Sequence, residues 1–267
     1  MSTQATSPLF KALNDIASGF RLHKIWTMLG WQDVKQRYRR SVIGPWWLTI
    51  STAVMVAGMG PLYGRLFGQP TAGYVSFVAA SLITWQLISS IITDSCQVFI
   101  AAEGHIKQTR LPLSIYVYRV IWRNLIIFGH NLTIMIPVFI LTPSAIDISM
   151  LLALAGLLLL LVNSVWMGLM FGILCARFRD IPQIITSFLQ IAFFLTPVFW
   201  KPEMLGKHQW VAQINPLFHL VEIIRNPLLG KSAPLLSWTV VIGITAVGSI
   251  VSLRLFSRYR PRVAYWL

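Results

Sequence analysis

Residues 150–175 read MLLALAGLLLLLVNSVWMGLMFGILC and contain no charged side chain. An apolar helix of this length crosses the roughly 30 Å hydrocarbon core of a bilayer. The chain contains five further apolar stretches. Only the fifth of the six is too short to cross the hydrocarbon core by itself, and its flanking residues would have to complete the span. The sequence therefore predicts an all-α polytopic membrane protein with six transmembrane helices, at about residues 46–67, 75–100, 120–141, 150–175, 184–199 and 236–255.

Basic residues between these stretches assign the two sides of the membrane. Of the 22 Lys and Arg residues, seven lie in the N-terminal tail, four around the second connection, two in the fourth and four in the C-terminal tail. The remaining five lie on the other side: Arg65, Lys201, Lys207, Arg225 and Lys231. Because short basic loops stay in the cytoplasm, the pattern predicts an even number of spans with both termini cytoplasmic.

Composition excludes several classes of protein. With 56% hydrophobic and 11% charged residues, the chain cannot form a soluble domain with a polar shell. The net charge is +14, and the basic residues responsible for it lie next to the apolar spans. This position favours attraction to anionic membrane lipids over a nucleic-acid partner. The segment Gly230-Lys231-Ser232 is not a phosphate-binding loop, because position 225 is Arg where such a loop needs Gly. We expect no catalytic residues, no metal site and no cofactor in this chain.

The first 45 residues form a cytoplasmic tail, and residues 46–267 form the transmembrane domain. Apolar residues recur at helical spacing over residues 9–40, which indicates an amphipathic helix on the inner membrane surface or against the protein's own cytoplasmic face. Arg37, Arg39 and Arg40 then precede the first span. They anchor the chain at headgroup depth, or they also attract a phosphate-bearing lipid substrate.

The second connection carries polar residues with a candidate role. Residues 101–118 hold Glu103, His105, Lys107 and Arg110 before a proline, which predicts a short polar helix that docks on another protein or is a solvated connector.

Two ionisable groups, Asp94 and His130, lie within predicted spans. Either an ion relay or an ordinary bond between helices explains them.

The long fifth connection, residues 201–234, is expected on the outer side. Its pattern predicts two short apolar helices, the second capped by Asn215 and ended at Asn226-Pro227. Short apolar helices that cannot cross suggest re-entrant elements beside a pathway. We assign an outer gate region to six residues here: Asn215, Pro216, Phe218, His219, Glu222 and Arg225.

Five segments carry a family resemblance: VKQRYRRSVIGPWW at 34–47, YGRLF at 63–67, RFRDI at 177–181, LTPVFW at 195–200 and INPLFH at 214–219. Together they resemble the permease subunits of type-2 ABC polysaccharide exporters, which move lipid-linked O-antigen, capsule or teichoic acid chains. The resemblance covers nearly all of the chain after residue 10.

The resemblance implies a homodimer joined to two ATPase subunits, which would bind ATP and Mg²⁺. It also implies an interface helix before the first span and a coupling helix in the second connection. The ATPase would then contact Glu103, His105, Lys107, Arg110, Arg177, Arg179 and Asp180. Spans one and five would line a channel whose aromatic side chains stack on sugars. Candidates for that lining are Trp47, Tyr63, Phe193, Phe194, Phe199 and Trp200.

The sequence thus predicts the transport subunit of an ATP-driven exporter of undecaprenyl-linked polysaccharide in the bacterial inner membrane. Substrate would enter beside Arg37, Arg39 and Arg40. One alternative is an efflux permease of the same superfamily for small molecules or lipids. A second is an ion-coupled secondary carrier, although neither many buried charges nor an internal repeat is evident.

Overall fold

The computed structural model describes residues 7–37, 39, 43–44, 46–141 and 148–267, and within them every regular element is a helix. An all-helical chain is expected for an apolar sequence, because each helix satisfies its own backbone hydrogen bonds in lipid. The predicted α class is therefore confirmed. The elements are α1 (Pro8–Arg21), α2 (His23–Arg37), α3 (Trp46–Leu66), α4 (Thr71–Gln97), α5 (Glu103–Gln108), α6 (Ser114–Leu132), α7 (Met135–Leu141), η1 (Ile148–Met150), α8 (Leu151–Arg177), α9 (Ile181–Leu195), η2 (Pro202–His208), α10 (Trp210–Ile214), α11 (Pro216–Leu228), α12 (Leu235–Tyr259), η3 (Arg260–Arg262) and α13 (Val263–Trp266).

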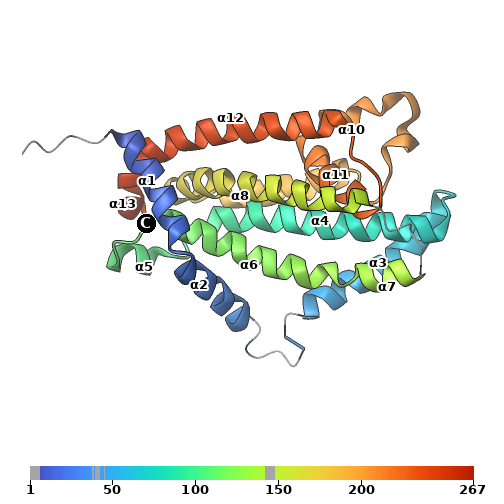
Figure 1. Cartoon of the computed structure of the whole chain (residues 1–267), viewed down its shortest axis with the longest axis horizontal. Coiled ribbons are helices and arrows are strands. Elements are labelled where there is room, and N and C mark those ends of the chain that lie inside the picture. The colour runs from blue at the N-terminus through green and yellow to red at the C-terminus, as the bar shows by residue number, and fades with distance from the viewer. Residues whose placement is uncertain (1–6, 38, 40–42, 45, 142–147) are drawn as a thin grey trace, which may run out of the picture.

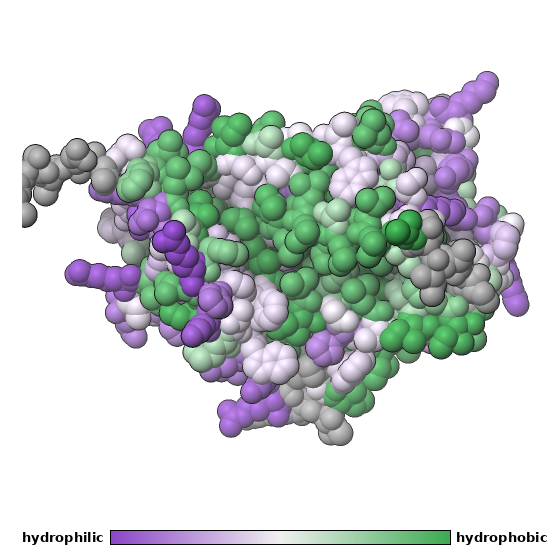
Figure 2. Space-filling view, in the orientation of Figure 1, coloured by the Kyte–Doolittle hydropathy of each residue, from purple (hydrophilic) through white to green (hydrophobic). Residues whose placement is uncertain are grey.

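Four helical stretches among the described residues are long and apolar enough to cross a membrane: Thr71–Gln97, Ser114–Leu141, Ile148–Arg177 and Leu235–Trp266. Their main helices α4, α6, α8 and α12 run side by side along the long axis of the molecule (Figure 1). Apolar residues cover the middle of the visible face, while hydrophilic residues gather at its two ends (Figure 2). The chain is a multi-pass membrane protein.

Helix α3 matches the first predicted span, whereas α9 begins three residues before the fifth predicted span and ends four residues before it does. Helix α3 has 21 residues and packs against α4, whereas α9 has 15 residues and is the shorter apolar helix. At 1.5 Å per residue, α3 is about 31 Å long and α9 about 22 Å. The prediction that these two helices also cross the membrane stays a prediction.

The two ends of the helix bundle differ in what they carry. Helices α1, α5 and α13 lie at one end, which we call the α5 end, while α10 lies at the other, which we call the α10 end (Figure 1). The core centres on α4, most of which is buried among α3, α6, α8, α9 and α11. Helix α12 packs against α8 and leaves most of its own surface exposed.

The third predicted span begins earlier than expected and is interrupted. Helix α6 starts at Ser114 rather than near residue 120, and a break separates its end at Leu132 from the start of α7 at Met135. Pro137 explains the break, because it has no N–H to donate to the carbonyl of Thr133.

The N-terminal segment forms two helices instead of one, separated at Leu22. Helix α1 packs on α6 and α12, and α2 packs on α6. The alternative in which this segment covers the protein's own surface therefore holds. Phe10 and Phe20 remain exposed on α1, as an additional contact with lipid would require.

The predicted Asn215 cap is confirmed in the fifth connection. The side chain of Asn215 accepts a hydrogen bond from the backbone N–H of Leu217 at 3.0 Å, and Pro216 is the first residue of α11. The predicted end at Asn226-Pro227 is wrong, since α11 continues to Leu228. Proline in the last turn of a helix removes one hydrogen bond, here to the carbonyl of Ile223, without ending the helix. Nearly all of α11 is buried within the protein.

Candidate functional site

A groove of about 480 Å³ lies between α3, α4 and α9. Polar side chains on its wall are hydroxyls and amides, and none of the described residues that line it is charged. Aromatic rings stand among them. The lining residues are Met55, Leu82, Trp85, Gln86, Ser89, Thr93, Thr186, Leu189, Gln190, Phe193 and Phe194. A wall of this composition offers flat apolar faces together with hydrogen-bond donors and acceptors, which is what sugar rings with their hydroxyl edges require.

Four of the six predicted channel residues come together at the α10 end of this groove. The ring of Phe199 stacks on that of Tyr63, with centroids 5.5 Å apart, and packs edge-on against Phe193 at 5.4 Å. Phe193 in turn contacts Phe194 and Trp85. The cluster joins α3, α4 and α9, so it fixes the width of the groove.

The other two predicted channel residues, Trp200 and Trp47, are placed differently. The indole N–H of Trp200 donates to the carbonyl of Phe194 at 3.1 Å, which holds Trp200 beside the cluster. Trp47 lies at the far end of α3 from Tyr63 and is 58% exposed. Trp47 is therefore not part of the aromatic cluster.

A chain of polar side chains connects α3 to α4 and α6 beside the groove. Thr49 donates to Asn131 at 3.1 Å, Asn131 donates to Gln86 at 3.0 Å, and Gln86 donates to Thr52 at 2.9 Å. Thr52 completes the chain by donating to the carbonyl of Leu48 at 2.9 Å. Because each group has a partner, these polar residues are tolerated among apolar helices.

The predicted partner-docking residues lie near one another at the α5 end. Glu103, His105 and Lys107 are on α5, where Lys107 pairs with Glu103 at 2.6 Å, and Arg110 is exposed just after the helix. The hydrogen bond and charge of Lys107 lower the pKa of Glu103, with a smaller contribution from Arg179. Glu103 therefore stays ionised on an exposed surface.

Residues 177–180 reach the same surface through the C-terminal helix α13. The guanidinium of Arg177 lies 5.4 Å from the ring of Trp266, and Arg179 donates to the backbone carbonyl of Trp266 at 3.4 Å. Asp180 is exposed next to them, and α13 also packs against α5. Residues far apart in sequence thus form one exposed, charged surface, which we call the α5-end surface.

Asp15 holds three segments together at the α5 end. Its carboxylate, buried on α1, accepts from the backbone N–H groups of Leu113 at 3.2 Å and Ser114 at 3.0 Å, and from Arg260 Nε at 2.6 Å. These two N–H groups begin α6, so Asp15 caps a helix from a distance. The contact fixes α6 and the C-terminal segment relative to α1.

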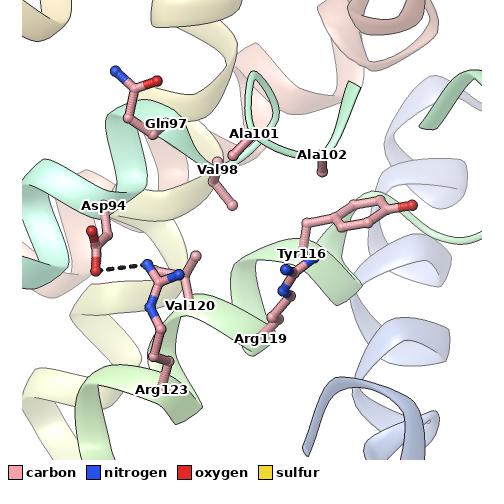
Figure 3. Close-up of a pocket in the computed structure, with 9 residues that line it drawn as sticks. All are labelled: Asp94, Gln97, Val98, Ala101, Ala102, Tyr116, Arg119, Val120 and Arg123. Atoms are coloured by element: carbon pink, nitrogen blue, oxygen red, sulfur yellow. Dashed lines mark ion pairs between the residues drawn. The ribbon is translucent and has the colours of Figure 1, made fainter. Parts of the chain in front are cut away.

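A second ionic cluster connects α2, α6 and α4. Arg119 contacts Asp33 through Nε at 2.7 Å, and Arg123 pairs with Asp33 at 3.3 Å and with Asp94 at 2.8 Å. Figure 3 shows Arg123 reaching from α6 to Asp94 on α4. Asn124 also donates to Asp94 at 2.8 Å. The structure therefore supports the bond between helices as the role of Asp94.

His130 likewise has ordinary structural contacts. Its Nδ1 lies 2.8 Å from the carbonyl of Ile126, and its ring packs edge-on against Trp46. Arg37 ends α2 and is exposed, as is Arg39, so both are available to a ligand from solvent or headgroups. Arg40, the third predicted phosphate ligand, lies outside the described residues.

The predicted outer gate residues lie at the α10 end and are mostly buried. Asn215 donates to Thr196 at 2.8 Å, which connects α11 to the end of α9. His219 Nδ1 lies 2.8 Å from Ser237 Oγ, and Ser237 donates to Glu222. Phe218 and Arg225 are buried nearby, while Pro216 is exposed.

Sequence reasoning missed Asp15, Asp33, Trp85 and Gln86. A signal did exist for the two aspartates, because carboxylates are rare in this chain and these two stand in an otherwise basic tail. Trp85 and Gln86 carried no such signal, since a span-wide apolar pattern does not tell which face of α4 meets α9.

A family model described as "ABC-2 type transporter" matches residues 25–229. Two sequences of the O-antigen export system permease protein RfbA of Klebsiella pneumoniae are similar to the chain, at 22% and 24% identity over 87% of this chain and 91% of theirs. The polysialic acid transport protein KpsM of Escherichia coli is 20% identical over 79% of this chain and 84% of its own length. The family match includes the groove, the α5-end surface up to residue 180 and α11.

Proposed function

Because the chain belongs to the family of ABC-2 type transporters, we propose that it is the membrane-spanning subunit of an exporter for undecaprenyl-linked polysaccharide in the bacterial inner membrane. Permeases of this family work with an ATPase partner. Its relatives RfbA and KpsM are named for the export of O-antigen and the transport of polysialic acid, both of which are sugar polymers. The observation that carries the proposal is the uncharged groove lined by aromatic, hydroxyl and amide side chains.

Six spans and two cytoplasmic termini form part of the proposal. The four long apolar helices are joined by α3 and α9, with α9 completed by residues 196–200. Helix α11 is a re-entrant element, and its burial within the protein meets the condition under which a short helix is tolerated at membrane depth. The α5 end then faces the cytoplasm, as the distribution of basic residues requires.

A homodimer converts the groove into a conduit. One copy leaves the wall formed by α3, α4 and α9 open on one side, and a second copy related by a twofold axis closes it. Uncharged hydrogen-bonding groups and aromatic faces hold each sugar weakly and in many registers, so a long chain can slide.

The α5-end surface is the place where the ATPase subunit acts. Glu103, Lys107 and Arg110 project from α5 and the residues after it. Arg177 ends α8 and Arg179 follows it, and both contact Trp266 of α13 beside α5. The dimer would bind two ATPase subunits, which hold ATP and Mg²⁺. Since α1 is tied to α6 through Asp15, movement of α5 is passed to the spans rather than absorbed by a loose tail.

Arg37, Arg39 and Arg40 are proposed to receive the phosphates of the lipid carrier at the cytoplasmic headgroup layer. Guanidinium groups match phosphate oxygens in a bidentate way, and Arg37 and Arg39 are exposed where a lipid can reach them.

We expect lipid-linked glycan to stimulate ATP hydrolysis by the purified permease in complex with its ATPase partner. The triple substitution R37Q/R39Q/R40Q is expected to lower this stimulation at least tenfold, because the phosphate contacts are lost. The assembly itself should remain, as judged by co-purification of the ATPase. Transport driven by an ion gradient in the absence of ATP, or stimulation of hydrolysis by small amphiphiles but not by glycan, would contradict the proposed function.

A further inference from the structure

A second cavity of about 480 Å³ lies at the α10 end, formed by α4, α11, η2 and the segment after α11. We call it the outer cavity. It shares no lining residue with the groove between α3, α4 and α9. Its charged lining residues are Lys201, Glu203, Glu222, Arg225 and Lys231, three cations and two carboxylates.

Arg225 is the unusual member of this set, because it is only 2% exposed. Among the described residues no carboxylate oxygen lies within 4 Å of its guanidinium. Its hydrogen-bond partners are the carbonyl of Pro197 at 2.6 Å, the amide oxygen of Asn226 at 3.4 Å and the hydroxyl of Ser81 at 3.5 Å, and the ring of Phe77 lies 4.7 Å away. Carbonyl dipoles and a ring offset only part of the cost of burying a charge. Within the described part of the chain, this buried cation beside an open cavity therefore has no carboxylate in direct contact.

Lys201 presents a second such cation to the same space. Its Nζ contacts the amide oxygen of Gln69 at 2.9 Å and lies 5.7 Å from the ring of Phe77, the ring that Arg225 also covers. Burial lowers the pKa of Lys201, and the charge of Lys231 lowers it further. Two cations thus converge on one ring, where an anion would stabilise both.

Neither carboxylate forms an ion pair with these cations within 4 Å among the described residues. Glu222 instead accepts from neutral donors, from Ser237 through Oε2 and from Asn226 through Oε1. Glu203 is exposed at the rim, and it raises the pKa of Lys201 less than burial lowers it. The lining keeps a net charge of one positive unit.

The depth of the cavity indicates where its anion comes from. Helix α4 has 27 residues, which at 1.5 Å per residue is about 40 Å and matches a bilayer with its headgroup layers. Phe77 follows the first residue of α4 by six positions, or about 9 Å along the helix. The outer cavity therefore lies where lipid headgroups meet the hydrocarbon, rather than deep in solvent.

We propose that the outer cavity binds the phosphate group of a polyprenyl lipid on the α10 side of the membrane, between Arg225 and Lys201. The identity of the lipid rests on the proposed function. In that setting the site would receive the carrier phosphates after they have crossed, so it would be the outer counterpart of the arginines that precede α3.

The test is binding of farnesyl pyrophosphate, a short polyprenyl probe, to the purified permease and ATPase complex. The R37Q/R39Q/R40Q background removes competition from the inner arginines. In that background Lys201→Gln and Arg225→Gln are each expected to weaken binding at least tenfold. Lys207→Gln is the matched control, because Lys207 is an exposed lysine of η2 that does not line the cavity. It should bind as the background protein does.

Three results would overturn the proposal. The first is unchanged affinity in Lys201→Gln, a variant at a partly exposed position that should fold even where Arg225→Gln does not. The second is equal weakening by Lys207→Gln, which would indicate a general charge effect. The third is inorganic pyrophosphate binding as tightly as farnesyl pyrophosphate, which would mark a site for free anions. Because the readout is binding, the two proposals can fail separately. If the unsubstituted complex binds farnesyl pyrophosphate at this site but exports no polysaccharide, the proposed function alone is contradicted.

Discussion

Replacing Asp15 with alanine is expected to lower the free energy of unfolding by about 3 kcal/mol, because it removes a buried carboxylate with three charged or backbone partners. The backbone N–H groups of Leu113 and Ser114 would lose the acceptor that caps α6. Arg260 would lose its carboxylate partner in the same step. The two N–H groups would be left without an acceptor in a buried region, whereas Arg260 is partly exposed and can turn to water.

The same substitution should also uncouple ATP hydrolysis from transport. Asp15 fixes the start of α6, only a few residues after α5, to α1 and to η3. Thermal unfolding of the purified permease would measure the first effect, and glycan-stimulated hydrolysis against export the second. Asn14→Ala is the matched control, since its side chain is exposed on the same turn of α1. An unfolding temperature of Asp15→Ala equal to that of Asn14→Ala would contradict the role of the carboxylate.

Gly156→Ala is the second substitution with a large expected effect. A Cβ atom at this buried position of α8 would lie 2.4 Å from the carbonyl oxygen of Ile223 and 3.0 Å from its carbon. These are backbone atoms of α11, so no side-chain rotation relieves the clash. Overpacking of this kind costs about 1–3 kcal/mol, and a rigid backbone neighbour places Gly156 at the upper end.

The position of Gly156 follows from the proline in α11. Pro227 has no N–H for the carbonyl of Ile223, and the missing side chain of Gly156 lets α8 approach that oxygen. Displacing α11 would move Glu222 and Arg225 as well, so export should fall together with stability.

Gly243→Ala provides the comparison for this prediction. It is the same substitution in the helix interior of α12, at an exposed glycine where a Cβ would meet nothing within 4 Å. It is expected to be neutral or to stabilise by up to about 1 kcal/mol through helix propensity. Gly156→Ala should therefore lower the unfolding temperature, while Gly243→Ala leaves it unchanged or raises it. An unfolding temperature of Gly156→Ala equal to that of Gly243→Ala would show that α8 and α11 are not tightly packed at Gly156.

The fold could be predicted from the sequence wherever one strong pattern decided it. Uninterrupted apolar runs located α4, α6, α8 and α12, and Asn215-Pro216 located the start of α11. The predicted helix limits differ from the structure beside two prolines, Pro137 and Pro227. Proline removes one hydrogen bond in either place, and only packing decides whether the helix breaks or continues.

The site was predictable only in part, because contacts between distant segments leave no local pattern. Tyr63, Phe193 and Phe199 were chosen as aromatics on two spans, and the structure brings them together. Trp85 joins them from α4 although nothing in its neighbours distinguished it. Asp15 meets Arg260 across 245 positions of the chain, a pairing that charge alone does not specify.

Photo-crosslinking in the working transporter shows whether the groove between α3, α4 and α9 conducts a polysaccharide. A photoreactive residue at Gln190 lines the groove, whereas one at Val162 on α8 is exposed outside it. During ATP turnover with lipid-linked glycan, the account predicts capture of glycan at position 190 and none at position 162. Equal capture at both positions, or capture at position 162 alone, would contradict it.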